Sequence, residues 1–238
     1  FGIPSRPAGL EVTFAGKPLR PARYPNPGAK DGGWLRIKEK LGDKQFSLSD
    51  PRPNEWKAMD DVWVYGYWTF DWADSHEQVV GFDTDTQVLT TAEKGGVYGY
   101  SKGRRFFFNH VLEELDEPGE WWLDRKSGRL VIYPPAPIKA GDVLVSEVSQ
   151  PIFRIEKARN VTLRRLVLES GRSHGIEMIN SEDCTIESSI LRNFGQVGVR
   201  ILGGRRCRTN GCEISGNGEN GVTLSGGDRK SLTPAGHR

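Results

Sequence analysis

The sequence has no long hydrophobic run and no excess of charge of either sign. No apolar stretch approaches the ~18 residues that read as a membrane-spanning helix, so we expect no membrane span. The 33 Lys and Arg residues are nearly balanced by 31 Asp and Glu residues, which leaves a net charge of +2. This balance lacks the basic footprint typical of nucleic-acid-binding proteins, and we expect no nucleic-acid partner.

Cysteine is scarce, and the motifs that hold metals or nucleotides are missing. The three cysteines, Cys184, Cys207 and Cys212, lack the spacing of a metal site or a disulfide framework, which favours buried free thiols. No phosphate-binding loop, nucleophile elbow or His/Cys cluster occurs in the sequence. We therefore expect no metal and no cofactor.

Apolar stripes of helical period are also absent, but another period is present near the end of the chain. Gly175, Gly198 and Gly221 are separated by 23 residues each time. A fixed period of this size is typical of a solenoid, and alternating apolar and polar residues within each repeat indicate strands. The sequence therefore predicts an all-β fold containing a parallel β-helix of 23-residue coils. The rows expected to stack inside the coils are Ile176, Val199 and Val222; Met178, Ile201 and Leu224; Leu168, Leu191 and Ile214; and Val161, Cys184 and Cys207, with Phe153 and Ile155 one coil earlier.

Charged residues occupy the outward positions between these rows. The first outward row is Arg154, Glu177, Arg200 and Thr223, and the second is Arg164, Glu187 and Asn210. The sign alternates between neighbouring coils about 4.8 Å apart, which predicts cross-strand ion pairs. A solvated ladder of ion pairs is the simpler account of these carboxylates, and a catalytic role is the alternative.

The first part of the chain does not carry the period, and all seven tryptophans lie there. We predict a β-rich, Trp-rich domain over residues 1–135 and β-helix coils over residues 136–238, beginning with the strand Asp142–Val145. The expected hairpins pair Leu10–Phe14 with Leu19–Tyr24 and Glu120–Arg125 with Arg129–Tyr133; the expected strands include Asp61–Trp72, broken at Gly66, and Gln87–Thr91, and Arg105–Leu115 is a strand or a short helix.

Several motifs carry a resemblance to a known group of proteins. They are Arg23-Tyr-Pro-Asn26 after the turn Ala15-Gly-Lys-Pro18, Gly66-Tyr-Trp68 with Asp71-Trp-Ala-Asp74, Leu115–Leu130 with Tyr133-Pro-Pro135, and the tail Ser225–Gly236. In these motifs the chain resembles bacterial right-handed β-helix proteins similar to family-141 glycoside hydrolases. The resemblance implies a right-handed helix, an inserted β-rich domain, a polysaccharide or oligosaccharide ligand, and an extracellular or periplasmic location. It also implies further coils beyond residue 238, where the catalytic carboxylates of the family are expected.

The two ends of the sequence agree with this expectation. The chain starts at Phe1 without a Met or a signal peptide, and the last coil is followed by no capping repeat. We therefore interpret the chain as an internal fragment of a longer protein.

Three polar residues of the coils are candidates for substrate binding. Gly226-Gly227 lets the backbone leave the strand, which places Asp228 and Arg229 on a loop at the edge of the coil. Their carboxylate and guanidinium suit sugar hydroxyls or a uronate, although both side chains could instead fix the loop. His174 occupies a turn beside Gly175, where a structural role is the alternative.

Trp68, Trp72 and Asp74 are the candidates of the Trp-rich part. Flat apolar rings beside carboxylates have the ingredients of a sugar platform. The alternative is that these aromatic residues form the core of the domain.

Three functions from different classes stay open. The first is a glycoside hydrolase acting on plant-type polysaccharide side chains or xylan-like chains, which needs two carboxyl groups at one bond. The second is a polysaccharide lyase, and the third is a non-catalytic glycan-binding or structural stalk. No catalytic residue is assigned. We expect that this fragment alone does not turn over glycans, although the longer parent protein does, since no convincing carboxylate pair is visible in it.

Overall fold

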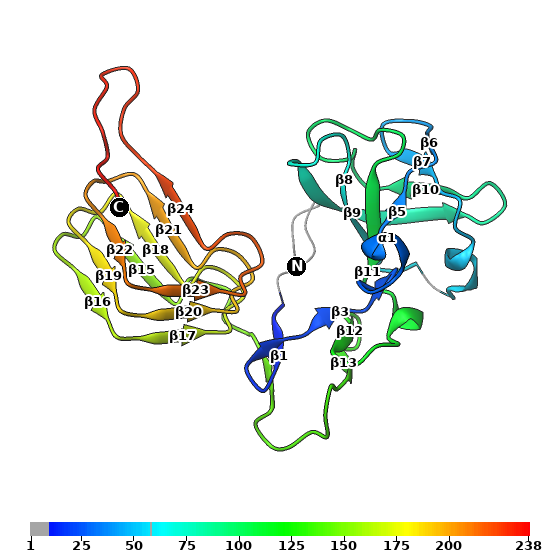
Figure 1. Cartoon of the computed structure of the whole chain (residues 1–238), viewed down its shortest axis with the longest axis horizontal. Helices are drawn as coiled ribbons and strands as arrows, with labels where there is room; N and C mark the ends of the chain where they lie inside the picture. The colour runs from blue at the N-terminus through cyan, green and yellow to red at the C-terminus, as the bar shows by residue number, and fades with distance from the viewer. Residues whose placement is uncertain (1–9, 58) are drawn as a thin grey trace. The chain divides into compact units, whose positions relative to one another are not determined.

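The computed structural model of the chain describes residues 10–57 and 59–238. The chain forms two compact units (Figure 1). The first, called here the sheet unit, comprises Leu19–Pro137; the second, the coil unit, comprises the described residues up to Pro18 together with Ile138–Arg238. In the sequence the sheet unit is therefore an insertion between two segments of the coil unit.

The sequence predicts a boundary between residues 135 and 136, whereas this division falls after Pro137 and also sets apart the segment that ends at Pro18. Strand β1 (Val12–Phe14) pairs antiparallel with β14 (Val143–Val145), which assigns it to the coil unit. The strand β14 consequently does not begin the coils, contrary to our expectation for Asp142–Val145.

The first predicted hairpin is only partly present. Strand β1 turns into β2 (Lys17–Pro18), and the ladder stops there because Pro18 has no backbone N–H to donate. The chain continues instead into β3 (Arg20–Pro21), which pairs parallel with β12 (Glu120–Asp124). The predicted pairing of Leu10–Phe14 with Leu19–Tyr24 is therefore wrong beyond Pro18.

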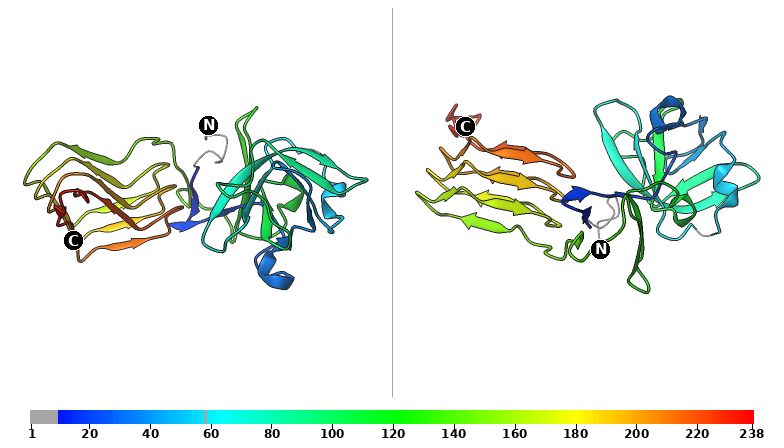
Figure 2. Two further views of the ribbon diagram at one scale, coloured as in Figure 1. Left: turned by 90° about the horizontal axis from the view of Figure 1, so that it is seen from above. Right: turned by 60° about the horizontal axis from the view of Figure 1, so that its bottom comes forward.

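The coil unit is a parallel β-helix of three coils and the first strand of a fourth. Each coil contributes one strand to each of three parallel sheets, and the coils lie one above another in Figure 2. The first sheet is β15 (Phe153–Glu156), β18 (Ile176–Ile179), β21 (Val199–Leu202) and β24 (Val222–Ser225); the second is β16 (Thr162–Arg164), β19 (Thr185–Glu187) and β22 (Arg208–Asn210); the third is β17 (Val167–Glu169), β20 (Ile190–Arg192) and β23 (Glu213–Ser215).

The register between coils confirms the predicted 23-residue period. Ile176 pairs with Val199, which pairs with Val222, and Glu177 pairs with Arg200 in the outward row. Ile176 and Val199 are fully buried, whereas Val222 on the last strand is exposed. Cys184 and Cys207 are buried free thiols within the same core, as the sequence predicts.

The sheet unit is built on an eight-stranded sheet. Its strand order is β4 (Arg23–Tyr24), β11 (Arg105–Asn109), β8 (Trp63–Tyr67), β9 (Asp74–Asp83), β10 (Val88–Thr91), β7 (Gln45–Ser47) and β6 (Glu39–Lys40), and β5 (Leu35–Arg36) also pairs with β11. The predicted hairpin of β12 with β13 (Arg129–Tyr133) is confirmed, and the ambiguous segment Arg105–Leu115 resolves into β11 and a 3₁₀ turn.

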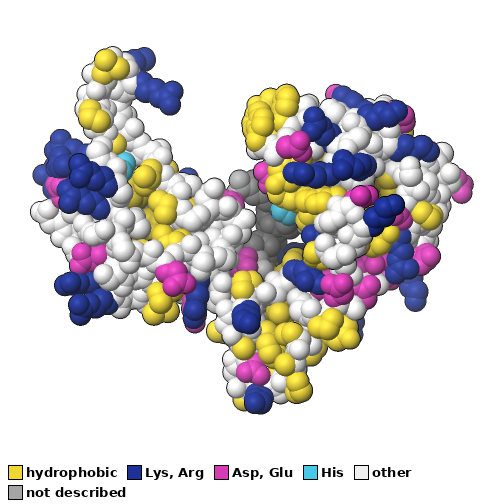
Figure 3. Space-filling view, viewed as in Figure 1, with side chains coloured by type: hydrophobic (Ala, Val, Ile, Leu, Met, Phe, Trp, Pro, Cys, Tyr) yellow, Lys and Arg dark blue, Asp and Glu magenta, His cyan; other side chains and the backbone are white. Residues whose placement is uncertain are grey.

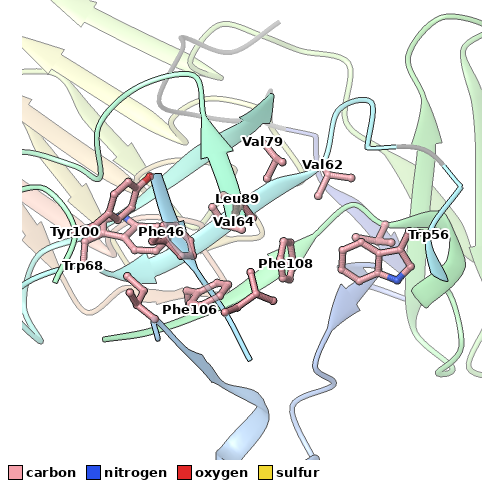
Figure 4. Packing of buried hydrophobic residues seen from close by; sticks show 13 residues of the cluster. Phe46, Trp56, Val62, Val64, Trp68, Val79, Leu89, Tyr100, Phe106 and Phe108 are labelled. Atoms are coloured by element: carbon pink, nitrogen blue, oxygen red, sulfur yellow. The ribbon is translucent and has the colours of Figure 1, made fainter. Parts of the chain in front are cut away.

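Aromatic rings fill the core of the sheet unit. Figure 4 shows a row that runs from Tyr100 through Phe46, Phe106 and Phe108 to Trp56. Successive ring centroids lie 4.8, 5.0, 5.6 and 4.9 Å apart along it, each pair edge to face. This geometry is the favoured contact between aromatic rings.

Gly66 does not break its strand, contrary to our prediction. Strand β8 passes through it without interruption, and the residue is buried. A Cβ atom at Gly66 would lie 2.7 Å from the Trp68 ring and 2.8 Å from Cβ of Phe106. The glycine is present because these two side chains pack directly on the backbone.

Helical segments are short throughout the described residues. They are α1 (Lys30–Gly33), η1 (Arg52–Glu55) and η2 (Leu112–Glu114). None of the helices in this part of the chain is long and apolar enough to cross a membrane.

Candidate functional site

One face of the eight-stranded sheet carries aromatic side chains that are only partly covered. Along β8 and β11, alternate residues point into the core, and the residues between them point outward. The outward rings of Tyr65, Tyr67 and Phe107 gather around Trp34, with ring centroids 6.3, 5.9 and 5.1 Å from it. We call these four half-buried residues the aromatic face.

Two arginines lie over this aromatic face. The guanidinium of Arg23 is 3.6 Å from the centre of the Phe107 ring, and that of Arg105 is 4.3 Å from the Tyr67 ring. Arg105 also forms an ion pair of 3.5 Å with Asp71. The surface therefore offers flat apolar rings together with planar donor groups, a combination that suits ligands with both apolar faces and hydroxyl groups.

A second group of rings stands on two loops beside Asp71. Phe70 and Trp72 stack at 5.3 Å with an angle of 8° between their planes, and Tyr98 meets both edge to face. Trp72 is 68% exposed, and Phe70 and Tyr98 are exposed as well. We call these three residues the loop cluster. Figure 3 shows hydrophobic side chains at the surface of the sheet unit.

The candidates of the Trp-rich part divide between this surface and the core. Trp72 belongs to the loop cluster, and the exposed Asp74 accepts a 2.7 Å hydrogen bond from the Tyr65 hydroxyl. Trp68 is only 2% exposed, and its indole donates to Ser75 Oγ within the core. We therefore correct the prediction for Trp68, because a buried ring has no surface for a ligand.

A buried carboxyl group supports the loop cluster from below. Glu77 Oε1 accepts hydrogen bonds from the Ser75 hydroxyl and from the backbone N–H of Gly96, in the loop that carries Tyr98. A further bond from Thr69 Oγ1 to the Gly99 carbonyl ties the two loops together. Burial raises the pKa of Glu77 above its usual range. These contacts hold the exposed rings in fixed positions.

Asp228 and Arg229 lie together on the loop after β24, and both are exposed. The Asp228 carboxylate accepts bonds from the backbone N–H of Lys230 and from Ser231 Oγ, at 2.9 and 2.8 Å. The hydrogen bond from Ser231 lowers the pKa of Asp228. The carboxylate thus closes its own turn, and its low pKa does not suit a general acid.

His174 is buried in the turn before β18. Its Nδ1 accepts a hydrogen bond from the backbone N–H of Val197, and its Nε2 lies 3.1 Å from Arg200 Nη1. Burial and the charge of Arg200 lower the pKa of this imidazole. Arg200 also pairs with Glu177 at 3.2 Å. Within this group of side chains His174 links two neighbouring coils.

The outward charges of the coils form the predicted ladder of ion pairs. Arg164 pairs with Glu187 at 2.7 Å, and Glu177 lies between Arg154 and Arg200. We expected these carboxylates to be solvated, but the side chain of Glu177 is only 8% exposed. Figure 3 shows the Lys and Arg side chains gathered along the surface of the coils.

Sequence reasoning missed one titratable group of the coil unit. Glu11 precedes β1, and burial raises its pKa to about 7. Such a pKa is typical of a general acid near neutral pH. The contacts of Glu11 come from segments distant in the sequence, since its backbone N–H donates to Ser146 Oγ and a Cβ atom at Gly195 would lie 3.2 Å from its Oε1. Among the described residues, no group of three or more His, Cys, Asp or Glu side chains is placed to hold a metal ion.

The aromatic face was also missed, although a signal for it exists. Tyr65 and Tyr67 are two residues apart in a strand, as are Arg105 and Phe107, so each pair must share a face. What the sequence does not show is that β8 and β11 are neighbours, which brings the two pairs together.

Comparisons with known proteins support the fold. A family model described as a right-handed β-helix region matches residues 152–233. A solved structure named "Glycoside hydrolase" is similar with a TM-score of 0.55 and 9% identity, over 89% of this chain and 55% of that one. The chain thus spans about half the length of that relative, and at this identity the likeness shows the fold alone. A comparison with curated proteins finds no match. The right-handed parallel β-helix with an inserted β-rich domain, predicted from the sequence, is confirmed.

Proposed function

We propose that the sheet unit binds a glycan on the loop cluster and the aromatic face. The observation that carries the proposal is the stacked pair of Phe70 and Trp72, exposed at the surface and supported from below. Aromatic rings that are exposed to water do not stabilise the core, and clusters of them often mark binding sites. A sugar ring can stack on such rings.

The polar groups around these rings favour the same ligand. Asp71 and Arg105 form an ion pair between the two aromatic groups, and Asp74 lies beside Tyr65. Sugar hydroxyl groups donate hydrogen bonds to carboxylates and accept them from guanidinium groups. The site therefore offers both kinds of partner beside the apolar surface that sugar rings cover.

For the whole protein we infer hydrolysis of a polysaccharide of the plant type, such as a xylan-like chain. The support is the resemblance to family-141 glycoside hydrolases together with the β-helix that the chain shares with the glycoside hydrolase named above. Burial raises the pKa of the half-buried Glu11 to about 7, which makes it the residue of the coil unit to test as an acid. Hydrolysis needs a second, ionised carboxylate close to it, and we assign none.

The experiment is affinity gel electrophoresis of the chain in a panel of soluble neutral and acidic polysaccharides. We expect retardation by at least one neutral polysaccharide, and loss of most of it in Trp72→Ala. The matched control is Tyr133→Ala, which removes an aromatic ring that is 43% exposed outside the site. Equal retardation of both variants would contradict the proposed site.

The same panel tests turnover. Release of reducing ends by the chain indicates hydrolysis, and an unsaturated product detected by ultraviolet absorbance indicates a lyase. We expect binding without turnover from this chain. Hydrolysis by the chain that is lost in Glu11→Gln would show that the catalytic site is complete within it.

A further inference from the structure

A pocket of about 430 Å³ opens next to the aromatic face, within the sheet unit. Trp34 lines both, so the two surfaces are continuous. The side chains on which the argument rests are Tyr24, Asn26, Trp34, Asp50, Arg52 and Asp116. The volume lies in the range typical of sites for small organic ligands.

The rim of this pocket is held in a fixed conformation. Arg23 donates hydrogen bonds to the carbonyls of Pro25 and Gly33, at 2.9 and 2.6 Å, and thereby fastens the loop between them. Asp31 adopts a φ of 57°, in the left-handed region that is unfavourable for a residue with a Cβ. A Cβ atom at Gly33 would lie 2.4 Å from the carbonyl oxygen of Asn26. The φ of Asp31 is a form of backbone strain that is often kept at ligand sites, whereas Gly33 only allows the close approach of Asn26.

The polar groups inside are partly paired with one another. The Tyr24 hydroxyl donates to Asp50 Oδ2 at 2.9 Å, and Asn26 Nδ2 donates to Asp116 Oδ1 at 2.8 Å. Asn26 Oδ1, in contrast, is buried and has no hydrogen-bond partner among the residues that the structure describes. Because this oxygen is buried, a ligand in the pocket does not reach it, and the exposed carboxylate of Asp116 is the accessible acceptor beside it.

The balance of charge indicates which ligand fits. Four carboxylates line the pocket, those of Asp31, Asp50, Glu114 and Asp116, against the two cations Lys30 and Arg52. Arg52 is already bound to Glu114 at 2.7 Å. The free capacity of the pocket is therefore mostly that of hydrogen-bond acceptors, which favours hydroxyl donors and disfavours an anion.

We propose that this pocket is a further subsite, which binds one neutral sugar unit of a glycan lying on the aromatic face. The inference rests on the proposed function, and it adds the class of sugar. Hydroxyl groups of the unit donate to the carboxylates of Asp116 and Asp50, and its ring lies against Trp34. A uronate is excluded, because its carboxylate would be repelled by the carboxylates that line the pocket.

The test is ¹⁵N NMR of the indole N–H groups, which reports on each tryptophan separately. Methyl β-xyloside and methyl β-glucoside are the short neutral probes, methyl galacturonide is the acidic probe, and neutral hexasaccharides are the long probes. We expect the short neutral probes to shift the Trp34 signal and leave Trp72 unchanged, and the long probes to shift both. The acidic probe is expected to shift neither.

Two variants examine the pocket directly. Asp116→Asn keeps the acceptor for Asn26 but removes the charge, and we expect about tenfold weaker binding of the short probes, the usual cost of losing a hydrogen bond to a charged group. Ala29→Phe fills the pocket from an exposed position on its rim, and should abolish the Trp34 response. Asp60→Asn, an exposed carboxylate outside the pocket, is the control and should bind as the unaltered chain does.

The outcomes separate this inference from the proposed function. The long probes could shift the Trp72 signal but not the Trp34 signal, with Asp116→Asn and Ala29→Phe binding the probes as the unaltered chain does. In that case the pocket inference is overturned and the proposed function stands. If no probe shifts either signal, both are overturned. If methyl galacturonide shifts Trp34 at lower concentration than the neutral probes, the pocket binds sugars of the opposite class and the assignment to neutral sugars fails.

Discussion

Glu77 carries a carboxylate oxygen, Oε2, that is buried in the sheet unit and has no hydrogen-bond partner within the described part of the chain. Burial raises the pKa of this group from its ordinary value of 4.5. The folded state therefore holds the proton more tightly than the unfolded chain does, and the free energy of unfolding falls as pH rises above about 4.5.

Replacing Glu77 by Gln removes that dependence, because the amide is neutral at every pH. We expect Glu77→Gln to melt at a temperature equal to or above that of the unaltered chain at pH 7, with the difference shrinking towards pH 4.5. Thermal unfolding followed by circular dichroism between these pH values measures it, with the exposed Glu213→Gln as the control. A lower melting temperature at pH 7 that does not change with pH would contradict the account.

The sequence predicts an aromatic platform in this part of the chain, but it does not show which of the aromatic residues are exposed. Trp68 and Trp72 are four residues apart in one motif, yet one is buried and the other is 68% exposed. The difference arises because Phe46, Tyr100 and Phe106 surround Trp68. Those partners lie far away in the sequence or on other elements, so no local pattern reveals them.

Among the elements, the glycine row of the coils shows how the period is enforced. A Cβ atom at Gly198 would lie 2.5 Å from Ile214 Cγ2 and 2.8 Å from the carbonyl oxygen of Gly221. At Gly221, in the same row on the last coil, the nearest atom would be 3.7 Å away. A change of glycine to alanine would therefore cause a steric clash at Gly198 and an ordinary contact at Gly221.

We expect Gly198→Ala to lower the free energy of unfolding by about 1–3 kcal/mol, the usual cost of overpacking, and Gly221→Ala to change it by less than about 0.5 kcal/mol, as at most tolerant sites. Chemical denaturation of the two variants side by side provides the comparison. Equal destabilisation of both would mean that the row is kept for a reason other than the close approach of neighbouring coils.

The elements of the two units differ in how far the sequence predicts them. The coils are predictable because each one contacts the next at a constant separation along the chain, as for Ile176 and Val199. The sheet unit depends on pairings that no period marks, such as β3 with β12 and β4 with β11. Its existence could be predicted, but its strand order could not.

For the whole molecule, we place glycan binding on the sheet unit and expect no contact between the glycan and the strands β15 to β24 of the coils. The carboxylates of the coils are already bound, as for Glu177 between two arginines and Asp228 within its own turn. The exposed rings and the partly paired pocket belong to the sheet unit. The sequence alone predicts a different location, in which Asp228, Arg229 and His174 of the coil unit bind the substrate.

Hydrogen–deuterium exchange of the chain with and without a neutral hexasaccharide decides between the two locations. We predict slower exchange in peptides that cover residues 24–36, 65–76 and 95–107, which carry the pocket rim, the aromatic face and the loop cluster. Exchange is expected to stay unchanged across the coils and the loop after them, from 152 to 229. Slower exchange confined to coil peptides around His174 or Asp228, with the sheet unit unchanged, would contradict the account.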